Sequence, residues 1–451
     1  MAENIMADQP DLRAMFEGKQ YSLLRETMSD MNEADIAAFM NSMSRDESLR
    51  MFRILPKDMA ADVFANLELD DQQYIIQSLS DKEAGTVIDN LMADDATDLL
   101  EEMPAGVARR LLANANPETR ADINHLLRYP EDSAGSIMTV EYVSLREHMT
   151  VADAIERIRR IGLDSETTNV CYVLDERRKL TGTVALRYLL IKKPEDVIGD
   201  FMNTNVISIN TMTDQEEAAR QFQKYDFNVM PVVDAEERMV GIITIDDVVD
   251  ILQEEATEDI EKMAAILPTD KPYFRVGVFE TYRKRMPWLL LLMISATFTG
   301  AIIMHFEQAL ASAVVLTAYI PMLMDTGGNA GGQASVSIIR GLSLGEIRFE
   351  DLLKTVFKEF RVSILCGATL SLANFAKLLL IDHIQMTVAL VICATLVVVV
   401  IIAKLVGCVL PLLAKKIGFD PAVMASPMVT TIVDALALFA YFNIATVMLH
   451  L

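Results

Sequence analysis

Five apolar runs in the last third of the chain constrain its fold more than any other feature. They cover roughly residues 287–306, 309–338, 356–381, 386–413 and 421–449, and each is long enough to cross a bilayer as a helix. Since a bilayer offers the backbone no hydrogen-bond partners, segments of this kind must be helical. The sequence therefore predicts a multidomain membrane protein whose transmembrane domain, residues 286–451, is all-α with five helices.

The charge of the chain lies almost entirely before these runs. Residues 1–286 hold 55 acidic and 31 basic side chains, residues 287–451 hold nine of each, and the net charge is −24. Binding to nucleic acid requires a basic surface, so nucleic acid is excluded as a partner. The acidic half suits a cation, although a solvated acidic surface is the commoner use of such charge.

Basic residues between the apolar runs indicate the orientation in the membrane. They lie before the first run (Arg283–Arg285), between the second and third, and between the fourth and fifth (Lys415, Lys416). The positive-inside rule then predicts a multi-pass protein of the cell membrane with cytoplasmic N-terminal domains and an external C-terminus. The N-terminal residues show no secretory signal, and the four scattered cysteines indicate neither disulfides nor a zinc site.

An internal repeat of 24 residues occupies positions 31–126 and begins at Met31, Leu55, Leu79 and Met103. Its apolar positions recur at helical spacing, which predicts a helical superhelix over residues 1–130. An acidic pair recurs as 46–47, 70–71 and 94–95. We expect these pairs to cap the second helix of each repeat, and rank metal binding below capping for the first two pairs.

A second duplication follows in residues 131–254. The segments 137–145, 170–175 and 180–188 resemble 201–209, 229–234 and 239–247, and each copy holds an amphipathic helix and β-branched strands. This predicts two small α/β modules that pack together. A long amphipathic helix is then expected over 246–267, within a connecting segment of residues 246–285. Its acidic side chains recur at spacings of three and four residues and crowd one flank. The resulting repulsion is tolerated if water screens it, or relieved if a divalent cation bridges the acids.

The second apolar run contains the polar segment 320–335, IPMLMDTGGNAGGQAS. Asp325, Asn329 and Gln333 lie four residues apart and therefore share one helix face. The glycine pairs 327/331 and 328/332 match the spacing of closely packed membrane helices. We expect Pro321 to break one backbone hydrogen bond and kink the helix. This stripe suits either a water-filled path or a packing helix.

The fifth apolar run contains one carboxylate, Asp434, together with Pro427, Thr430 and Thr431. A charge at this depth is unfavourable by several kcal/mol unless it meets water or a partner, so a functional role is expected, although an ion pair or interhelical hydrogen bond is the alternative. The surrounding donors are all oxygens, which favours Mg²⁺ or Ca²⁺ over Zn²⁺ or copper. With one acid in this span of each chain, neutralising a divalent ion requires a second chain, which suggests a symmetric dimer.

The chain resembles the MgtE family of magnesium channels over essentially its whole length. The order of domains matches, and the segments PMLMDTGGNAGGQAS and DPAVMASPMVTTIVDALALFAYF carry the resemblance. It implies a homodimer in the membrane lipid, with a tandem CBS (cystathionine-β-synthase-type) pair as Mg²⁺ sensor and a pore between the second and fifth spans of both subunits. No catalytic residues are implied, and no grouping in the sequence indicates an enzyme.

Residue by residue, the resemblance implies three sets of binding residues. The pore set is Asp434, Asn329, Ser426 and Thr430, with Ser426 standing where some members have Asn. The regulatory metal set is Glu216, Asp226, Asp247, Asp250, Glu255, Glu258, Asp259, Asp420, Asp94, Asp95 and Asp98. A nucleotide set for ATP comprises Arg187, Asn205, Phe227, Thr244 and Asp247. The GxxTxxD element of CBS pairs is complete in the second module, as Gly241, Thr244 and Asp247. In the first module the same positions are Gly182, Ala185 and Tyr188, so the element is degenerate there.

These observations favour a Mg²⁺-selective uptake channel that cytoplasmic Mg²⁺ closes by bridging the acids of the sensor. One alternative is a secondary transporter that couples a divalent cation to H⁺ or Na⁺, because broken helices and a midplane acid also fit that class. A second is a membrane enzyme or nucleotide-sensing scaffold.

Overall fold

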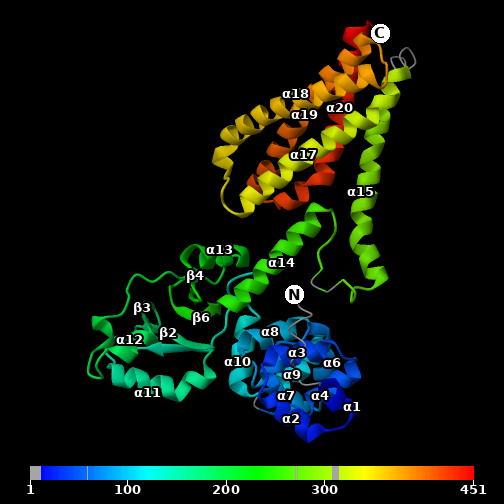
Figure 1. Ribbon diagram of the computed structural model, residues 1–451. Coiled ribbons are helices and arrows are strands. Elements are labelled where there is room, and N and C mark those ends of the chain that lie inside the picture. The colour runs from blue at the N-terminus through cyan, green and yellow to red at the C-terminus, as the bar shows by residue number, and fades with distance from the viewer. Residues whose placement is uncertain (1–11, 58, 270, 272, 307–313, 451) are drawn as a thin grey trace. The chain divides into compact units, whose positions relative to one another are not determined.

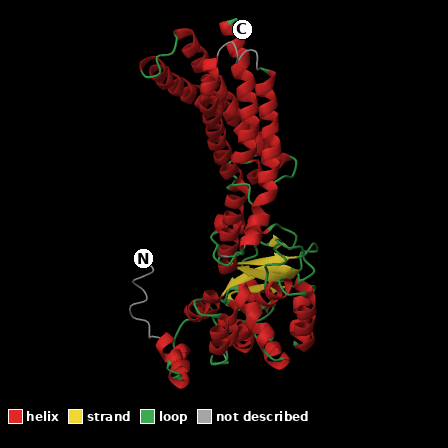
Figure 2. Ribbon diagram, turned by 90° about the vertical axis from the view of Figure 1, so that its right-hand side faces the viewer, coloured by secondary structure: helices red, strands yellow, loops and turns green. Residues whose placement is uncertain are grey.

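A computed structural model describes residues 12–57, 59–269, 271, 273–306 and 314–450 (Figure 1). The chain forms two compact units, one ending at Leu252 and the other beginning at Gln253. All strands among the described residues belong to the first unit, and the described regular structure of the second unit is helical (Figure 2).

From Leu12 onward, the described residues of the first unit form ten short helices before the first strand. From α3 onward each helix packs against the second helix after it, α3 on α5 and so on to α8 on α10. This i, i+2 pattern confirms the helical superhelix, and its core is a continuous cluster of buried side chains from Leu12 to Ile123. The helices are α1 Leu12–Glu17, α2 Tyr21–Ser29, α3 Glu33–Asn41, α4 Arg45–Phe52, α5 Ala60–Ala65, α6 Leu69–Ser78, α7 Asp81–Ile88, α8 Ala93–Glu101, α9 Ala105–Asn114 and α10 Pro117–Leu126.

The recurring acidic pairs lie at the starts of α4, α6 and α8, but they are not the N-caps that the sequence predicted. The N-cap residues are Ser44, Glu68 and Met92, and the acids occupy the second and third helical positions. Negative charge is also favourable there, because the first turn is the positive end of the helix dipole. Of these carboxylates, Glu47 completes a capping box by accepting from the backbone N–H of Ser44 at 3.1 Å, and Asp71 is buried.

The two predicted α/β modules are present and related by the duplication. The sheet of the first module has the order β1-β2-β3 and that of the second β4-β5-β6; in both, the first pair is parallel and the second antiparallel. The elements are β1 Tyr142–Leu145, α11 Val151–Ile161, β2 Thr167–Leu174, β3 Leu180–Ala185, α12 Leu186–Ile191, β4 Ile209–Asn210, α13 Gln215–Tyr225, β5 Val229–Val233 and β6 Met239–Thr244.

The modules exchange backbone pairing with each other. Thr139, which leads into the first module, pairs with Ile242 of β6, and Asn203, which leads into the second, pairs with Thr183 of β3. A shared apolar cluster that includes Tyr172 and Met239 lies between them. The two copies therefore form one body.

Helix α14, Ile245–Met263, follows the second module and crosses the boundary between the units. It ends four residues earlier than predicted. Ala265 adopts a left-handed conformation, and Lys284 Nζ donates to the backbone oxygen of Pro268 at 2.5 Å, which ties the following loop to the next helix.

After α14, the described residues of the second unit form five long helices: α15 Val278–His305, α17 Ile320–Ser343, α18 Leu352–Leu380, α19 Met386–Lys416 and α20 Ser426–Leu449. Four regions of the described residues are long and apolar enough to cross a membrane, and they contain α15, α18, α19 and α20. Helix α17 has the length, but its segment 325–335 is too polar and glycine-rich for that criterion. The part of the second predicted span before residue 314 lies outside the described residues.

Neither proline of the predicted pathway kinks a helix. Pro321 and Pro427 both lie in the first turn of their helices, α17 and α20, where the missing N–H has no intrahelical partner to lose. The predicted kink at Pro321 is therefore wrong: a 3₁₀ segment, Val314–Tyr319, precedes α17, and the proline starts the α-helix. The carbonyl oxygen of Pro427 accepts a hydrogen bond from Thr431 Oγ1 at 3.0 Å.

Glycines let α17, α19 and α20 approach closely. A Cβ on Gly407 of α19 would lie 2.2 Å from the carbonyl oxygen of Gly331 in α17, and a Cβ on Gly331 would lie 2.7 Å from Val429 of α20. The next helix is held differently: Lys404 of α19 lies 4.0 Å from Glu359 of α18, with only 7% and 12% of the two side chains exposed. Each buried charge thereby compensates the other.

We expect Gly407→Ala to destabilise the second unit, because the added methyl group must displace backbone of α17; overpacking of this kind costs about 1–3 kcal/mol. Gly300→Ala is the matched control, since nothing lies within 4 Å of its Cβ position in α15. Thermal unfolding of both variants in detergent should show a lower midpoint for Gly407→Ala alone. Equal midpoints would mean that this contact does not limit packing.

Candidate functional site

A groove in the second unit brings together the polar residues of α17 and α20. It has a volume of about 450 Å³ and is lined by Ile320, Pro321, Met324, Asp325, Gly328, Asn329, Thr430 and Asp434. Asp325 and Asn329 come from the predicted polar stripe of α17. Thr430 and Asp434 face them from α20.

The backbone of Gly328 makes this pairing possible. A Cβ there would lie 3.0 Å from Thr430 Cγ2, so a larger residue would push α20 away. Asp434 is half-buried, and its Oδ1 atom is buried without a hydrogen-bond partner in the described structure. A buried carboxylate oxygen without a donor is unfavourable unless a cation meets it.

The sequence predicted most of this groove. Asp434, Asn329 and Thr430 come together as expected, whereas Gln333 and Thr431 do not line the groove. The side chain of Ser426 lies outside the described structure. Asp325 was placed in the stripe but not in the predicted pore set, and its four-residue spacing to Asn329 was the signal that could have included it.

A second constellation in the same unit joins the connecting helix to the start of α20. Lys262 Nζ lies 2.5 Å from Glu258 Oε1 and 2.7 Å from Asp420 Oδ2. Asp420 also accepts from the backbone N–H of Ala422 at 2.8 Å, in the 3₁₀ turn Pro421–Met424. Two predicted regulatory acids thus share a cation supplied by the protein itself. The sequence could not indicate this, because Lys262 and Asp420 are distant along the chain.

Two hydrogen bonds connect α17 to the connecting helix and to the turn before α20. Ser343, at the end of α17, donates to the predicted regulatory acid Asp259 at 3.4 Å. Ser335, near the middle of α17, donates to the backbone oxygen of Met424 at 3.1 Å. The connecting helix and the turn before α20 are therefore both linked to the groove-lining helix α17.

Another set of acids gathers in the first unit, where α8 meets the CBS pair. Burial and the adjacent Asp95 raise the pKa of Asp94 well above its usual value. Burial and the carboxylates of Asp247 and Asp246 raise the pKa of Asp95 to about 6. Burial likewise raises the pKa of Asp247 to about 6, against a hydrogen bond from Thr244 that lowers it.

Glu166 and Glu141 extend this acidic set, and neither was predicted. Burial and the charges of Asp246 and Asp247 raise the pKa of Glu166 to about 7. Glu141 contributes to the raised pKa of Asp94, Asp95 and Glu166. Glu141 directly precedes β1 and Glu166 directly precedes β2, and neither belongs to an acidic run that could have marked it in the sequence.

The remaining regulatory candidates are placed differently, and among them Asp250 is close enough for its charge to raise the pKa of Asp247. Glu216 is paired with Arg220 of its own helix, and Asp226, in a left-handed conformation, lies at the end of that helix. Asp250 is exposed on α14, and Asp98 lies on α8. In the described ranges, no three acidic, histidine or cysteine side chains converge as a preformed metal site. The acids are close enough to repel but not to enclose an ion.

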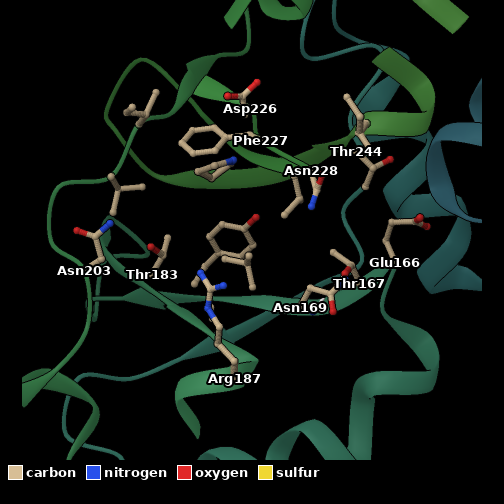
Figure 3. A pocket seen from close by; sticks show the side chains of 18 of the residues that line it. Glu166, Thr167, Asn169, Thr183, Arg187, Asn203, Asp226, Phe227, Asn228 and Thr244 are labelled. Carbon is tan, nitrogen blue, oxygen red and sulfur yellow. Dashed lines mark hydrogen bonds between the residues drawn. The ribbon is translucent and has the colours of Figure 1, made fainter. Parts of the chain in front are cut away.

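A large pocket of about 790 Å³ lies between the two modules of the CBS pair. Arg187 extends into it from one wall and Phe227 lies across from it, with Asn169, Thr183 and Asn203 around them (Figure 3). Of the predicted nucleotide set, Arg187, Asn205, Phe227 and Thr244 line the pocket, and Asp247 is reached through its bond to Thr244. An arginine, an aromatic ring and several amides suit a phosphorylated base.

The fold and these sites define a class of protein: a helical membrane protein that carries a tandem CBS pair. Family models match residues 31–132 as an MgtE intracellular N domain, 134–193 and 198–254 as CBS domains, and 320–444 as an MgtE divalent cation transporter. The magnesium transporter MgtE of Thermus thermophilus is 37% identical over 95% of both chains, and that of Bacillus subtilis is 33% identical over both full lengths. The chain belongs to the MgtE family.

Two solved structures resemble the first part of the chain. One is the cytosolic domain of the Mg²⁺ channel MgtE in complex with ATP, 37% identical, which covers 53% of this chain and 98% of its own with a TM-score of 0.51. The other is the soluble part of a magnesium transporter, 28% identical, covering 54% and 96% with a TM-score of 0.52.

The raised pKa values predict that the first unit loses stability as pH rises. A carboxylate whose pKa is higher in the folded state stabilises the fold when protonated, and this contribution disappears as pH rises from about 4 through about 6. We expect the unfolding midpoint of a fragment of residues 1–267 to fall between pH 5 and 7.5 without divalent ions, by about 2–4 °C for each kcal/mol lost. Mg²⁺ at pH 7.5 should reverse the fall.

The double variant Asp94→Asn/Asp95→Asn should show a smaller fall and a smaller response to Mg²⁺. Asp35→Asn is the matched control, because Asp35 is an exposed acid in the first turn of α3 in the same helical array. A midpoint that does not change with pH, or an equal response in the control, would contradict a role for this acidic set.

Proposed function

We propose that this protein is a Mg²⁺-selective channel whose ion path runs along the groove between α17 and α20. The observation that supports this most directly is the buried Oδ1 of Asp434, which has no donor in the described structure and opens onto a groove with Asp325, Asn329 and Thr430. Carboxylate, amide and hydroxyl oxygens are the ligands of hard divalent cations. The names of the two bacterial relatives agree with magnesium as the ion.

The groove recognises a hydrated ion in this proposal. Mg²⁺ releases its waters reluctantly and favours octahedral coordination, so one or two carboxylates acting through water serve it better than a closed cage. The groove is open and its donors come from one side, which suits a site completed by a second copy about a symmetry axis. We therefore propose a homodimer in the cell membrane, with cytoplasmic N-terminal domains and an external C-terminus.

Asp434→Asn should lower Mg²⁺ uptake into proteoliposomes at least tenfold, nearly as far as Asp434→Ala, because both remove the negative charge that attracts the hydrated ion. Asp325→Asn is the matched control in the same groove. Asp325 is exposed, whereas Asp434 is half-buried, so its loss should have a smaller effect. Normal uptake and selectivity in Asp434→Asn would refute the assignment of the pathway.

The proposed gating rests on the crowded acids around Asp95 and Asp247 in the first unit and on Lys262 in the second. Two carboxylates about 4 Å apart repel by roughly 4 kcal/mol at an effective dielectric of 20, and a bridging divalent ion reverses the sign of that energy. We propose that cytoplasmic Mg²⁺ bridges the sensor acids, compacts the assembly and closes the pore through α14. The stabilisation by Mg²⁺ predicted above for residues 1–267 tests this: without it, the acids are only a solvated surface.

ATP is the second ligand that we propose, at the pocket between the CBS modules. Its support is the placement of Arg187 opposite Phe227, and a solved relative 37% identical holds ATP. Binding there would influence the acidic set, since Thr244 lines the pocket and donates to Asp247 at 2.8 Å.

Arg187→Gln should weaken ATP binding about tenfold or more, because a hydrogen bond to a charged phosphate contributes about 1.5–3 kcal/mol. Arg177→Gln is the control: Arg177 is an exposed arginine of the same module that does not line the pocket. Isothermal titration of the full chain with ATP measures both. If the unsubstituted chain binds no ATP, or if the two variants bind equally, the nucleotide site is wrong.

A further inference from the structure

The segment that leads into α15 exposes an unusual number of aromatic side chains. Phe274 is 98% exposed, Phe279 85%, Tyr273 76% and Tyr282 56%. Isolated exposed apolar residues are ordinary, but a contiguous group of this size marks an interaction surface. Helix α15 itself has no buried residue, so the described structure leaves this surface uncovered.

The surface contains a groove with an apolar end and a cationic end. Its volume is about 510 Å³, and its walls include Phe274, Tyr282, Arg285 and Leu289. Leu289 belongs to the apolar run of α15, and Arg285 lies one helical turn before it. The order along the helix is therefore cation first and hydrocarbon next, which is the order of headgroup and acyl chain in a lipid.

Two cations of this surface, Arg283 and Arg285, are available to a ligand. Among the described residues, Arg283 and Arg285 have no ion-pair partner and both are exposed. Lys284 is used differently, since it donates to the backbone of Pro268 and holds the loop against the helix. Glu280, the one acid between residues 273 and 289, lies 3.9 Å from Lys271. The surface is thus positive in a chain whose net charge is −24.

We propose that this surface binds an anionic phospholipid of the membrane leaflet that the start of α15 enters, with the headgroup phosphate on Arg285, an acyl chain along Phe274, Tyr282 and Leu289, and Arg283 on another face of the helix adding to the positive potential. Charge complementarity selects this occupant. If a second copy covered the same surface about a twofold axis, these arginines would face the same arginines of that copy and repel them. A neutral lipid would leave the arginines without a counter-charge. Arginine next to aromatic side chains at the start of a span is also the arrangement that interfacial anchoring requires.

Trp288 makes the proposal directly measurable, because it is the single tryptophan of the chain and lies between Arg285 and Leu289. The full-length protein is reconstituted in phosphatidylcholine vesicles that contain a fixed fraction of either brominated phosphatidylglycerol or brominated phosphatidylcholine, and quenching of Trp288 fluorescence is compared. We expect stronger quenching by the anionic lipid, with a relative affinity about fivefold higher for each engaged arginine, and a decrease at high salt.

Arg283→Gln/Arg285→Gln should bring the two brominated lipids to equal quenching. Lys415→Gln/Lys416→Gln is the matched control, since it removes two basic residues at the end of α19 and should leave the preference unchanged. Equal quenching by both lipids in the unsubstituted chain, or equal loss in both double variants, would overturn the proposal in favour of unspecific surface charge. Quenching by neither lipid would overturn it in favour of a second copy covering the surface. The salt titration of the unsubstituted chain tests the proposal even if a variant fails to fold, and neither measurement depends on ion conduction.

Discussion

The close approach of α17 to α19 and α20 is the constraint on which the membrane unit depends. Gly331 brings its carbonyl into contact with Gly407 on one side and leaves room for Val429 on the other, while Gly328 admits Thr430. Since a bilayer provides no hydrophobic driving force between helices, association rests on such close packing. The position of Asp434 opposite Asp325 and Asn329 is a consequence of this packing, so the groove and the fold share the same glycines.

The two units manage charge in opposite ways. In the described part of the membrane unit, several buried or half-buried charges have a specific counterpart, as with Lys404 and Glu359, or Lys262 with Glu258 and Asp420, whereas Asp434 has a buried oxygen without one. In the first unit, burial together with the repulsion between neighbouring acids raises the pKa values of Asp95 and Asp247. A divalent cation stabilises a structure most where like charges already lie close together. This supports the proposed division into an ion pathway in the second unit and a Mg²⁺ sensor in the first.

Much of the fold could be predicted from the sequence because its signals are local and periodic. The repeat of 24 residues, the duplicated strands and the apolar runs each depend on neighbours a few positions away. The kink predicted at Pro321 is wrong because a proline can either kink a helix from within or begin one. Which of the two occurs depends on where the preceding turn ends. The acidic pairs lie two and three positions after the N-cap for a similar reason, since α8 begins after Met92 without a side-chain cap.

The contacts of the candidate site likewise divide into those that the sequence could predict and those that it could not. Asp434, Asn329 and Thr430 share helix faces, so spacing alone brings them together once two helices pack. Lys262 meets Asp420 and Glu166 approaches Asp247 only through tertiary structure, and no spacing in the sequence encodes these contacts.

The exchanged pairing of the two CBS modules bears on how this architecture came about. Thr139 completes the sheet of the second copy, and Asn203 that of the first. A gene that lost either copy would leave a sheet edge without its neighbour and half of a shared core exposed to water. The duplication is therefore difficult to reverse in evolution. Once the two copies had exchanged backbone pairing, the pair of modules could only be inherited as one unit.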